Sequence, residues 1–162
     1  MIGVGNLNLG GTGKTPTVEY LINLLQEHYR VAVLSRGYGR KTKGFRMADS
    51  QCTYKDLGDE PMQYFMKFPK IQVAVDEDRL EGARKLFYNN NHPDVILLDD
   101  AFQHRRIRAG LEILLTDYQR LYVDDHLFPV GTLRDLKSAA KRAHIIVVSK
   151  APKGLDEKTM AG

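Results

Sequence analysis

The sequence has few of the features that mark secreted, membrane or repeat proteins. Cys52 is the single cysteine among 162 residues, which excludes an internal disulfide and a multi-cysteine metal site and suits a reducing compartment. No apolar run approaches the ~18 residues that a spanning helix needs, and we expect no signal peptide, because the first residues lack its charged and apolar regions. There is no internal repeat and no low-complexity tract. These absences predict a globular domain of ordinary composition.

The charge balance favours no single class of partner. The chain carries 24 basic and 20 acidic residues, a formal net charge of +4 and a pI near 9.1. Because it has no long run of lysine or arginine, the charge indicates anionic ligands no more strongly than nucleic acid or a membrane surface. A length of 162 residues is that of one domain and is enough to bury a core.

Short apolar runs alternate with segments of helical spacing. We expect strands over residues 2–5, 30–35, 71–75, 93–98, 112–116 and 144–149, and helices over residues 15–28, 60–67, 78–90 and 133–143. Uninterrupted Val, Ile and Leu runs are typical of parallel strands covered on both faces. The predicted fold class is therefore a three-layer α/β domain of the P-loop NTPase type, with a mostly parallel sheet flanked by helices. Its ligands should bind at the carboxyl edge of the sheet, and residues 37–54 should form an exposed loop.

A glycine-rich segment between the first strand and the first helix predicts a phosphate-binding loop, defined here as residues 8–15. Its backbone N–H groups and the helix N-terminus would bind a phosphate. Lys14 would reach the β- and γ-phosphates and the Thr15 hydroxyl would bind Mg²⁺. A turn that only joins strand to helix is the alternative, and the Gly-Lys-Thr offset favours nucleotide binding. Asn8 replaces the first glycine of the usual pattern, and the candidate phosphate ligands are Gly10, Gly11, Thr12, Gly13, Lys14 and Thr15.

Two pairs of carboxylates follow predicted strands and are candidates for chemistry at the same edge. Asp99 and Asp100 end an apolar strand, where a carboxylate can hold a nucleotide-bound Mg²⁺; capping a strand end or starting a turn is the alternative. Asp59 and Glu60 could deprotonate an acceptor hydroxyl or help to ligate the metal. Spacing alone instead favours Asp59 as a helix N-cap, with Glu60 in the first turn.

Polar residues after two other strands are weaker candidates. Arg36 lies in a Gly- and Arg-rich loop that is suited equally to an anionic substrate or to solubility. Gln103 and His104 follow the paired aspartates, and the arginines beside them could neutralise a transferred phosphate, although a lone histidine is usually a surface residue. Residues 76–79 are better explained as a helix cap than as a site.

Four motifs, in this order, resemble the tetraacyldisaccharide 4′-kinases of lipid A biosynthesis. They are Val-Gly-Asn leading into Gly-Gly-Thr-Gly-Lys-Thr-Pro over residues 4–16, Leu-Ser-Arg-Gly-Tyr-Gly-Arg over 34–40, Gly-Asp-Glu-Pro over 58–61 and Leu-Asp-Asp-Ala-Phe-Gln-His-Arg over 98–105. The second and fourth distinguish this family from other P-loop proteins. The resemblance covers the chain to about residue 150, and Ala101 stands where many members have glycine.

The resemblance implies transfer of the γ-phosphate of ATP, with Mg²⁺, to the 4′-hydroxyl of tetraacyldisaccharide 1-phosphate. This reaction takes place at the cytoplasmic, inner face of a Gram-negative bacterium's cytoplasmic membrane, with an acylated lipid substrate and no nucleic acid as partner. Residue by residue, the resemblance implies that Lys14 contacts the phosphates, that Thr15 contacts Mg²⁺, and that Asp99 ligates the metal with Asp100 beside it. It implies that Asp59 deprotonates the acceptor and that Glu60 is a neighbouring site carboxylate. It implies substrate-side positions for Arg36, Gln103 and His104.

The length of the chain departs from the family more than the Ala101 replacement does. Its members are about twice as long, with an N-terminal helix that touches the membrane and a C-terminal part that completes a second lobe. We therefore expect residues 1–150 to be the nucleotide-binding lobe, residues 151–162 to be a truncated connection, and peripheral membrane contact to come from the missing segments. The histidine that assists the family's catalytic carboxylate lies in the missing part, so such a fragment should bind nucleotide but transfer phosphate poorly.

Two other classes of protein share part of the pattern. A P-loop switch or partition ATPase fits residues 10–15, but Leu9 occupies the place of the partition ATPases' signature lysine. A GTPase is disfavoured because Asn-Lys-x-Asp is absent, the nearest sequence being Ser-Lys-Ala-Pro at residues 149–152. A non-catalytic nucleotide-binding module is the second alternative, and acceptor-dependent phosphate transfer would separate it from a kinase.

Overall fold

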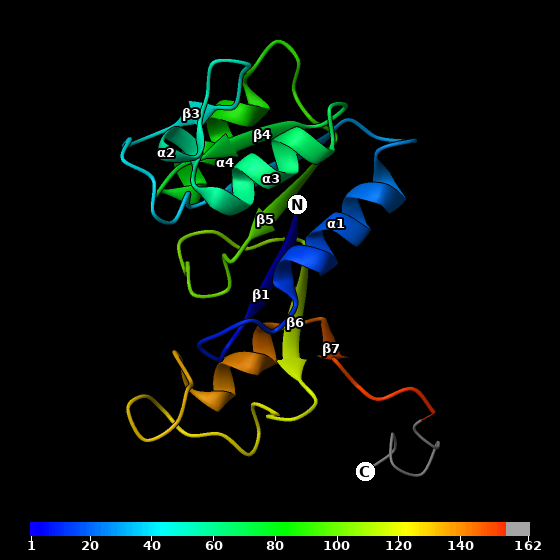
Figure 1. Ribbon diagram of the computed structural model, residues 1–162, viewed down its shortest axis with the longest axis vertical. Coiled ribbons are helices and arrows are strands. Elements are labelled where there is room, and N and C mark those ends of the chain that lie inside the picture. Colours follow the sequence, from blue (N-terminus) through cyan, green and yellow to red (C-terminus); the bar gives the residue numbers. More distant parts are fainter. Residues whose placement is uncertain (155–162) are drawn as a thin grey trace.

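A single mostly parallel sheet forms the centre of the computed structural model, which describes residues 1–154 (Figure 1). Its seven strands lie in the order β3-β4-β2-β5-β1-β6-β7, and only β3 is antiparallel to its neighbour. β1 therefore lies inside the sheet, so the segments that follow β1 and its neighbour β5 emerge side by side at the carboxyl edge. The strands are β1 Ile2–Asn6, β2 Val31–Ser35, β3 Arg46–Met47, β4 Gln72–Val75, β5 Val95–Asp99, β6 Leu111–Asp117 and β7 Ile145–Ser149.

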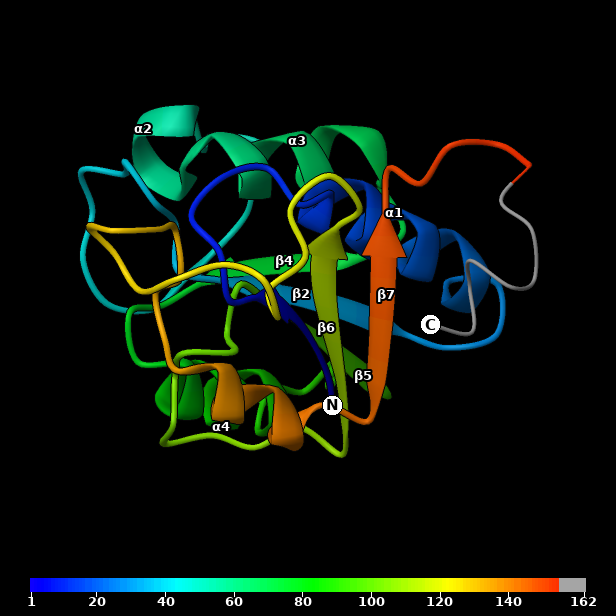
Figure 2. The ribbon, with the colours of Figure 1, turned by 90° about the horizontal axis from the view of Figure 1, so that it is seen from below.

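Helices cover both faces of this sheet (Figure 2), which confirms the predicted three-layer α/β class. Val18 of α1 and Tyr64 of α3 pack with strand residues on one face, and Leu86 of α4 packs with Leu34 and its neighbours on the other. A third apolar cluster forms under the one short 3-10 helix. The helices are α1 Lys14–Leu25, α2 Tyr54–Leu57, α3 Asp59–Lys67, α4 Arg79–Phe87 and the 3-10 helix η1 Lys137–Arg142.

The predicted elements are present except in two regions, and the short helix α2 was not predicted. The helix predicted over residues 133–143 is wrong at its start, because Leu133 pairs with Asn8 in an isolated bridge and only Lys137–Arg142 is helical. The loop predicted over residues 37–54 contains the short strand β3, which pairs with β4. In both regions, backbone hydrogen bonds to segments distant in sequence outweigh the local pattern.

The strand β7 differs from the expectation of a strand covered on both faces. Its side chains Ile145, Ile146, Val147 and Val148 are between 36% and 48% exposed, so residues 1–154 leave this edge of the sheet partly open. The predicted connection over residues 151–162 lies, after residue 154, outside the described residues. Among the described helices, none is both long enough and apolar enough to cross a membrane.

Gly58 fixes the approach of α3 to the loop after β2, and we expect Gly58→Ala to be strongly destabilising. Gly58 has φ 92° and ψ 165°, a region that is essentially restricted to glycine, and an added Cβ would lie 2.7 Å from the Tyr38 carbonyl oxygen. Strain and overlap together should lower the free energy of unfolding by roughly 3 kcal/mol or more, measured by urea denaturation.

Gly39→Ala is the matched control: Gly39 also has a positive φ, but its Cβ would meet nothing, so a loss of only about 1 kcal/mol is expected. Equal losses in the two variants would contradict this account.

Candidate functional site

The phosphate-binding loop connects β1 to α1 and leaves its donors open to a ligand. Gly10 and Gly13 have φ values of 110° and 84°, which turn the chain as a phosphate loop requires. Gly13 is the N-cap of α1 and no side chain caps that helix, so its first N–H groups remain available to an anion. The buried side chain of Asn6 holds the loop from beneath, donating to the carbonyl oxygens of Asn8 at 2.8 Å and Gly10 at 3.4 Å.

Lys14 points from α1 toward the end of β5. Its Nζ lies 3.3 Å from Asn6 Oδ1 and 3.6 Å from Asp100 Oδ1, and its side chain is 15% exposed. The ammonium group is thus held over the loop without being sealed from solvent. An incoming phosphate could take the place of the carboxylate as its partner.

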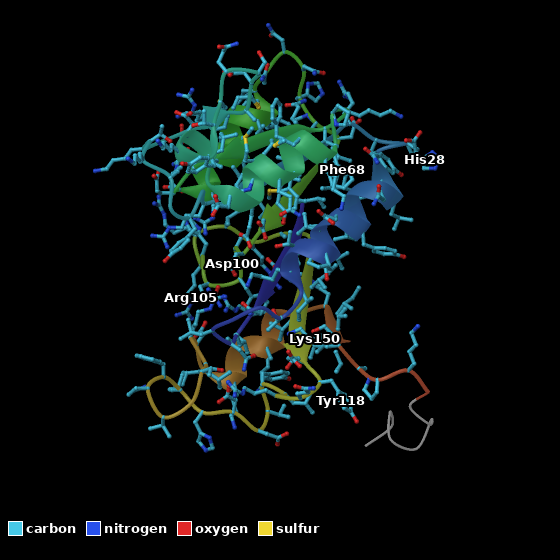
Figure 3. The ribbon with its side chains drawn as sticks, viewed as in Figure 1. His28, Phe68, Asp100, Arg105, Tyr118 and Lys150 are labelled. Carbon is cyan, nitrogen blue, oxygen red and sulfur yellow. The ribbon has the colours of Figure 1, made fainter. Side chains whose placement is uncertain are left out.

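Asp99 and Asp100 are adjacent in sequence but have different environments. Asp99 is 1% exposed; its Oδ2 lies 3.4 Å from the Tyr64 hydroxyl and its Oδ1 has no hydrogen-bond partner within the described residues. Burial, followed by the charges of Glu60 and Asp100, raises the pKa of Asp99 to about 7. Asp100, near the centre of Figure 3, has φ 49°, so its side chain leaves the strand in another direction.

Asp100 is the meeting point of two cations. Arg134 donates to both of its oxygens, at 2.9 and 3.2 Å. Burial raises the pKa of Asp100, but the Arg134 hydrogen bond and the charge of Lys14 outweigh it and the net shift is downward. Asp100 is therefore an ionised anchor for Lys14 and Arg134, whereas Asp99 is a buried carboxyl group without an ion pair.

The first turn of α3 brings the second pair of carboxylates to the loop. Glu60 accepts a hydrogen bond at 3.2 Å from the Thr15 hydroxyl. Asp59 is exposed, and its side chain makes no hydrogen bond or ion pair within residues 1–154. The prediction that Asp59 is the helix N-cap is wrong, because Gly58 holds that position and no side chain caps α3. The Asp59 carboxylate is thus free for another role.

The oxygen donors at this point fit a Mg²⁺ ion that arrives with a nucleotide. Thr15, Glu60 and Asp99 supply a hydroxyl and two carboxylates from three different elements, and the unpartnered Asp99 Oδ1 is the clearest sign of a missing ligand. No group of three or more metal-binding side chains stands ready within residues 1–154. Mg²⁺ bound with a nucleotide takes one or two carboxylates and completes its shell with water and substrate phosphates.

A cleft of about 580 Å³ opens beside these groups. Arg36 and Gln103 line it; Gln103 is fixed by a 2.6 Å hydrogen bond to the Asn6 carbonyl oxygen. His104 does not line the cleft. Burial and the charge of Arg79 lower the pKa of His104, and its Nδ1 has no hydrogen-bond partner within the described part of the chain. The lining residues are Gly10, Lys14, Ser35, Arg36, Tyr38, Asp59, Glu60, Pro61, Arg79, Asp100, Gln103 and Arg134.

The sequence did not indicate two of the cations in this cleft. Arg79 follows Asp78, which is the N-cap of α4 as predicted, but its own side chain is turned into the cleft and is buried, with no carboxylate partner among the salt bridges of residues 1–154. Burial, followed by the charge of Arg36, lowers the pKa of Arg79. Arg134 lies where the sequence pattern predicts a helix, but it precedes η1 in the structure. The first residue of α4 and the segment before η1 thus bring two more positive charges to the cleft beside the phosphate-binding loop.

The family comparison agrees with this geometry. The sequence model of the family described as tetraacyldisaccharide-1-P 4′-kinase matches residues 1–161. The chain belongs to this family. Its similarity to the tetraacyldisaccharide 4′-kinase of Flavobacterium johnsoniae is 55% identity over 161 residues, covering 99% of this chain and 47% of the relative. The relative in Parabacteroides distasonis is 58% identical over 152 residues, covering 93% of this chain and 41% of the relative.

A solved structure of the family has the same fold. The crystal structure described as the "apo" form of LpxK from Aquifex aeolicus in complex with ATP superposes with a TM-score of 0.82 at 38% identity, covering 91% of this chain and 47% of that one. The chain spans about half the length of the relatives it matches. The fold described here is therefore that of the matched part of this solved structure.

The buried carboxyl group of Asp99 gives a prediction about how the stability of the protein depends on pH. The pKa of Asp99 in the folded protein lies above its ordinary value of 3.8. The free energy of unfolding therefore falls as the pH rises from about 4 to 7, and Asp99 causes no further fall above pH 7. Asp99→Asn should therefore raise the free energy of unfolding by roughly 2 to 4 kcal/mol at about pH 8 without Mg²⁺, and by close to zero near pH 4. Urea denaturation at both pH values measures this. A variant that is less stable than the wild type at the higher pH would contradict the assignment.

Proposed function

We propose that this chain is the nucleotide-binding part of a kinase that transfers the γ-phosphate of ATP to the 4′-hydroxyl of tetraacyldisaccharide 1-phosphate, in lipid A biosynthesis. The observation that carries the proposal is the cleft in which Lys14, Arg134 and the exposed Asp59 carboxylate lie together. The family match, and the ATP in the similar solved structure, support the choice of nucleotide and acceptor. Within the chain, residues 1–150 would form the nucleotide-binding lobe.

The cations of the cleft suit the charge of the reaction. A transferring phosphoryl group spreads negative charge over its oxygens, so positioning and neutralisation matter more than covalent help. Lys14 would bind the β- and γ-phosphates, while Arg134 would turn from Asp100 toward the γ-phosphate. Arg79, buried and without a carboxylate partner in the described residues, would supply further positive potential.

The carboxylates of the site would divide two tasks between them. Asp59, exposed at the start of α3, would accept the proton of the acceptor hydroxyl. Thr15, Glu60 and Asp99 would hold Mg²⁺, and Asp100 would hold Lys14 and Arg134 in register before the nucleotide arrives. Mg²⁺, when bound, neutralises charge on the β- and γ-phosphates. Arg36 and Gln103 would contact the anionic acceptor, and His104, the next residue in the chain after Gln103, would support that side of the cleft.

The acceptor is an acylated lipid, so the reaction would take place at the inner face of the cytoplasmic membrane. This chain would take part as a peripheral protein, with its main membrane contacts supplied by parts of the family that lie outside the matched half. Catalytic turnover would likewise depend on those parts.

Acceptor-dependent release of ADP tests the proposal. The chain alone is compared with a chimera in which residues 1–161 replace the matching half of the Flavobacterium johnsoniae relative. We expect the chimera to release ADP in proportion to tetraacyldisaccharide 1-phosphate in detergent micelles, and the chain alone to bind Mg–ATP with little turnover. Release of ADP at the same rate with empty micelles would indicate a switch-type ATPase. Binding without any release from either protein would indicate a nucleotide-binding module, and either result would refute the kinase.

A further inference from the structure

Arg134 reaches the site from a segment with no regular secondary structure, so something else must hold its side chain in place. The segment between β6 and η1 is tied to the phosphate-binding loop by its backbone. The Leu9 N–H donates to the Thr132 carbonyl oxygen at 2.6 Å, and the Arg134 N–H donates to the Leu7 carbonyl oxygen at 2.7 Å. Between these two bonds, Asn8 and Leu133 form an antiparallel bridge. The position of Arg134 is therefore coupled to the first half of the loop.

A buried carboxylate completes this connection. Asp125 is 9% exposed and its Oδ1 accepts from the N–H groups of His126 at 2.7 Å and Thr132 at 3.1 Å. Its Oδ2 accepts from the Thr132 hydroxyl and, across the gap between the two segments, from Asn8 Nδ2 at 2.8 Å. These donors hold the pKa of Asp125 below its usual range. No cation forms an ion pair with Asp125 within residues 1–154.

Asn8 supplies the one side-chain donor that crosses from the phosphate-binding loop to this carboxylate. It is 4% exposed and occupies the position that is the first glycine of the usual phosphate-loop pattern. A glycine there has no side chain and could not donate to Asp125. The Asn8 side chain instead reaches a partner 117 residues away in the chain.

We propose that Asn8 and Asp125 are positioning residues that hold the Arg134 guanidinium at the γ-phosphate site. The proposal rests on the proposed function in that it takes the ligand to be a nucleoside triphosphate. The geometry continues from the Asn8–Asp125 hydrogen bond through the Asn8–Leu133 bridge to Arg134, whose guanidinium meets Asp100 and the Asn6 carbonyl oxygen. Loss of the hydrogen bond frees Arg134 to leave the γ-phosphate position while the rest of the loop still binds the α- and β-phosphates.

The test compares the affinities of this chain for Mg–ATP and Mg–ADP by titration calorimetry, because only ATP carries the group that Arg134 would contact. Arg134→Ala should reduce the preference for ATP over ADP by about tenfold, the value of one charge-assisted contact. Asn8→Ala and Asp125→Asn should each reduce it by about three- to tenfold and change the ADP affinity by less than about twofold. Asn8→Ala should have almost no further effect in the Arg134→Ala background.

Asp94→Asn is the matched control. Asp94 also accepts several hydrogen bonds, from the backbone and guanidinium of Arg30, but it lies before β5, at the amino edge of the sheet. The control should keep the wild-type preference for ATP. If Asn8→Ala does not fold, Asp125→Asn, which preserves side-chain shape, carries the same test.

Three results would overturn the inference. They are an unchanged preference for ATP in Asn8→Ala and Asp125→Asn, an equal loss of ATP and ADP affinity, and additive effects of Asn8→Ala and Arg134→Ala. Failure of the proposed function is recognised separately: the affinity pattern would be as expected, yet the chimera would transfer no phosphate to the lipid acceptor.

Discussion

Lys14→Ala should lower phosphate transfer by the chimera by about 10³-fold or more. The variant removes the one ammonium group that lies 3.6 Å from Asp100 and points over the phosphate-binding loop. Without it, charge that develops on the transferring group loses a pre-positioned partner, and losses of this order follow from removing one such contact. The fold should survive, because Asp100 keeps its two hydrogen bonds from Arg134.

The measurement is the initial rate of lipid phosphorylation at saturating ATP, together with the thermal unfolding midpoint. Lys85→Ala is the control, since Lys85 lies on α4, forms an ion pair with Glu81 of the same helix and lies over the Phe45 ring, away from the phosphate-binding loop; its rate should equal that of the wild type. A Lys14→Ala rate within about threefold of the wild type would remove the argument that this loop binds the transferred phosphate.

Asp59→Asn should lower kcat by roughly 10² to 10⁴-fold while leaving the affinity for Mg–ATP within about twofold. The asparagine has the same shape but cannot accept the proton of the acceptor hydroxyl. Because Asp59 is exposed and does not cap α3, the change should cost almost no stability.

Rates at saturating ATP and lipid, ATP affinity by calorimetry and urea denaturation together decide this prediction. Glu27→Gln is the matched control, because Glu27 is an exposed carboxylate that forms an ion pair with Lys70. A large loss of stability in Asp59→Asn would show that the residue supports the helix. Unchanged kcat would show that the base lies elsewhere, for example in the half of the family that this chain does not match.

The sequence predicted those parts of the site that depend on local pattern. A buried strand followed by Gly-rich residues and Lys-Thr specified the phosphate-binding loop, and the acidic end of β5 followed from its apolar run. Both features are set by residues next to each other in the chain. Their meeting at one edge follows from parallel topology alone.

The parts that the sequence missed depend on distant contacts. The local pattern predicts a helix at Arg134. Its position in the cleft depends instead on the bridge between Leu133 and Asn8, which are distant in the chain. The different environments of Asp99 and Asp100 follow from the positive φ of Asp100 and its two cationic partners, which no local pattern encodes. Asn8 is the residue of the sequence that indicates this connection, because it stands where the usual phosphate-loop pattern has glycine and its side chain can bind a partner.

The most direct test of the central claim is the identity of the phosphorylated product. The chimera is incubated with Mg²⁺, ATP carrying heavy oxygen in its γ-phosphate, and tetraacyldisaccharide 1-phosphate, and the lipid is analysed by fragmentation mass spectrometry. The account predicts one added phosphoryl group, with the heavy oxygen, on the 4′ position of the sugar distal to the existing 1-phosphate. Labelled inorganic phosphate with unchanged lipid, at a rate independent of the acceptor, would contradict it.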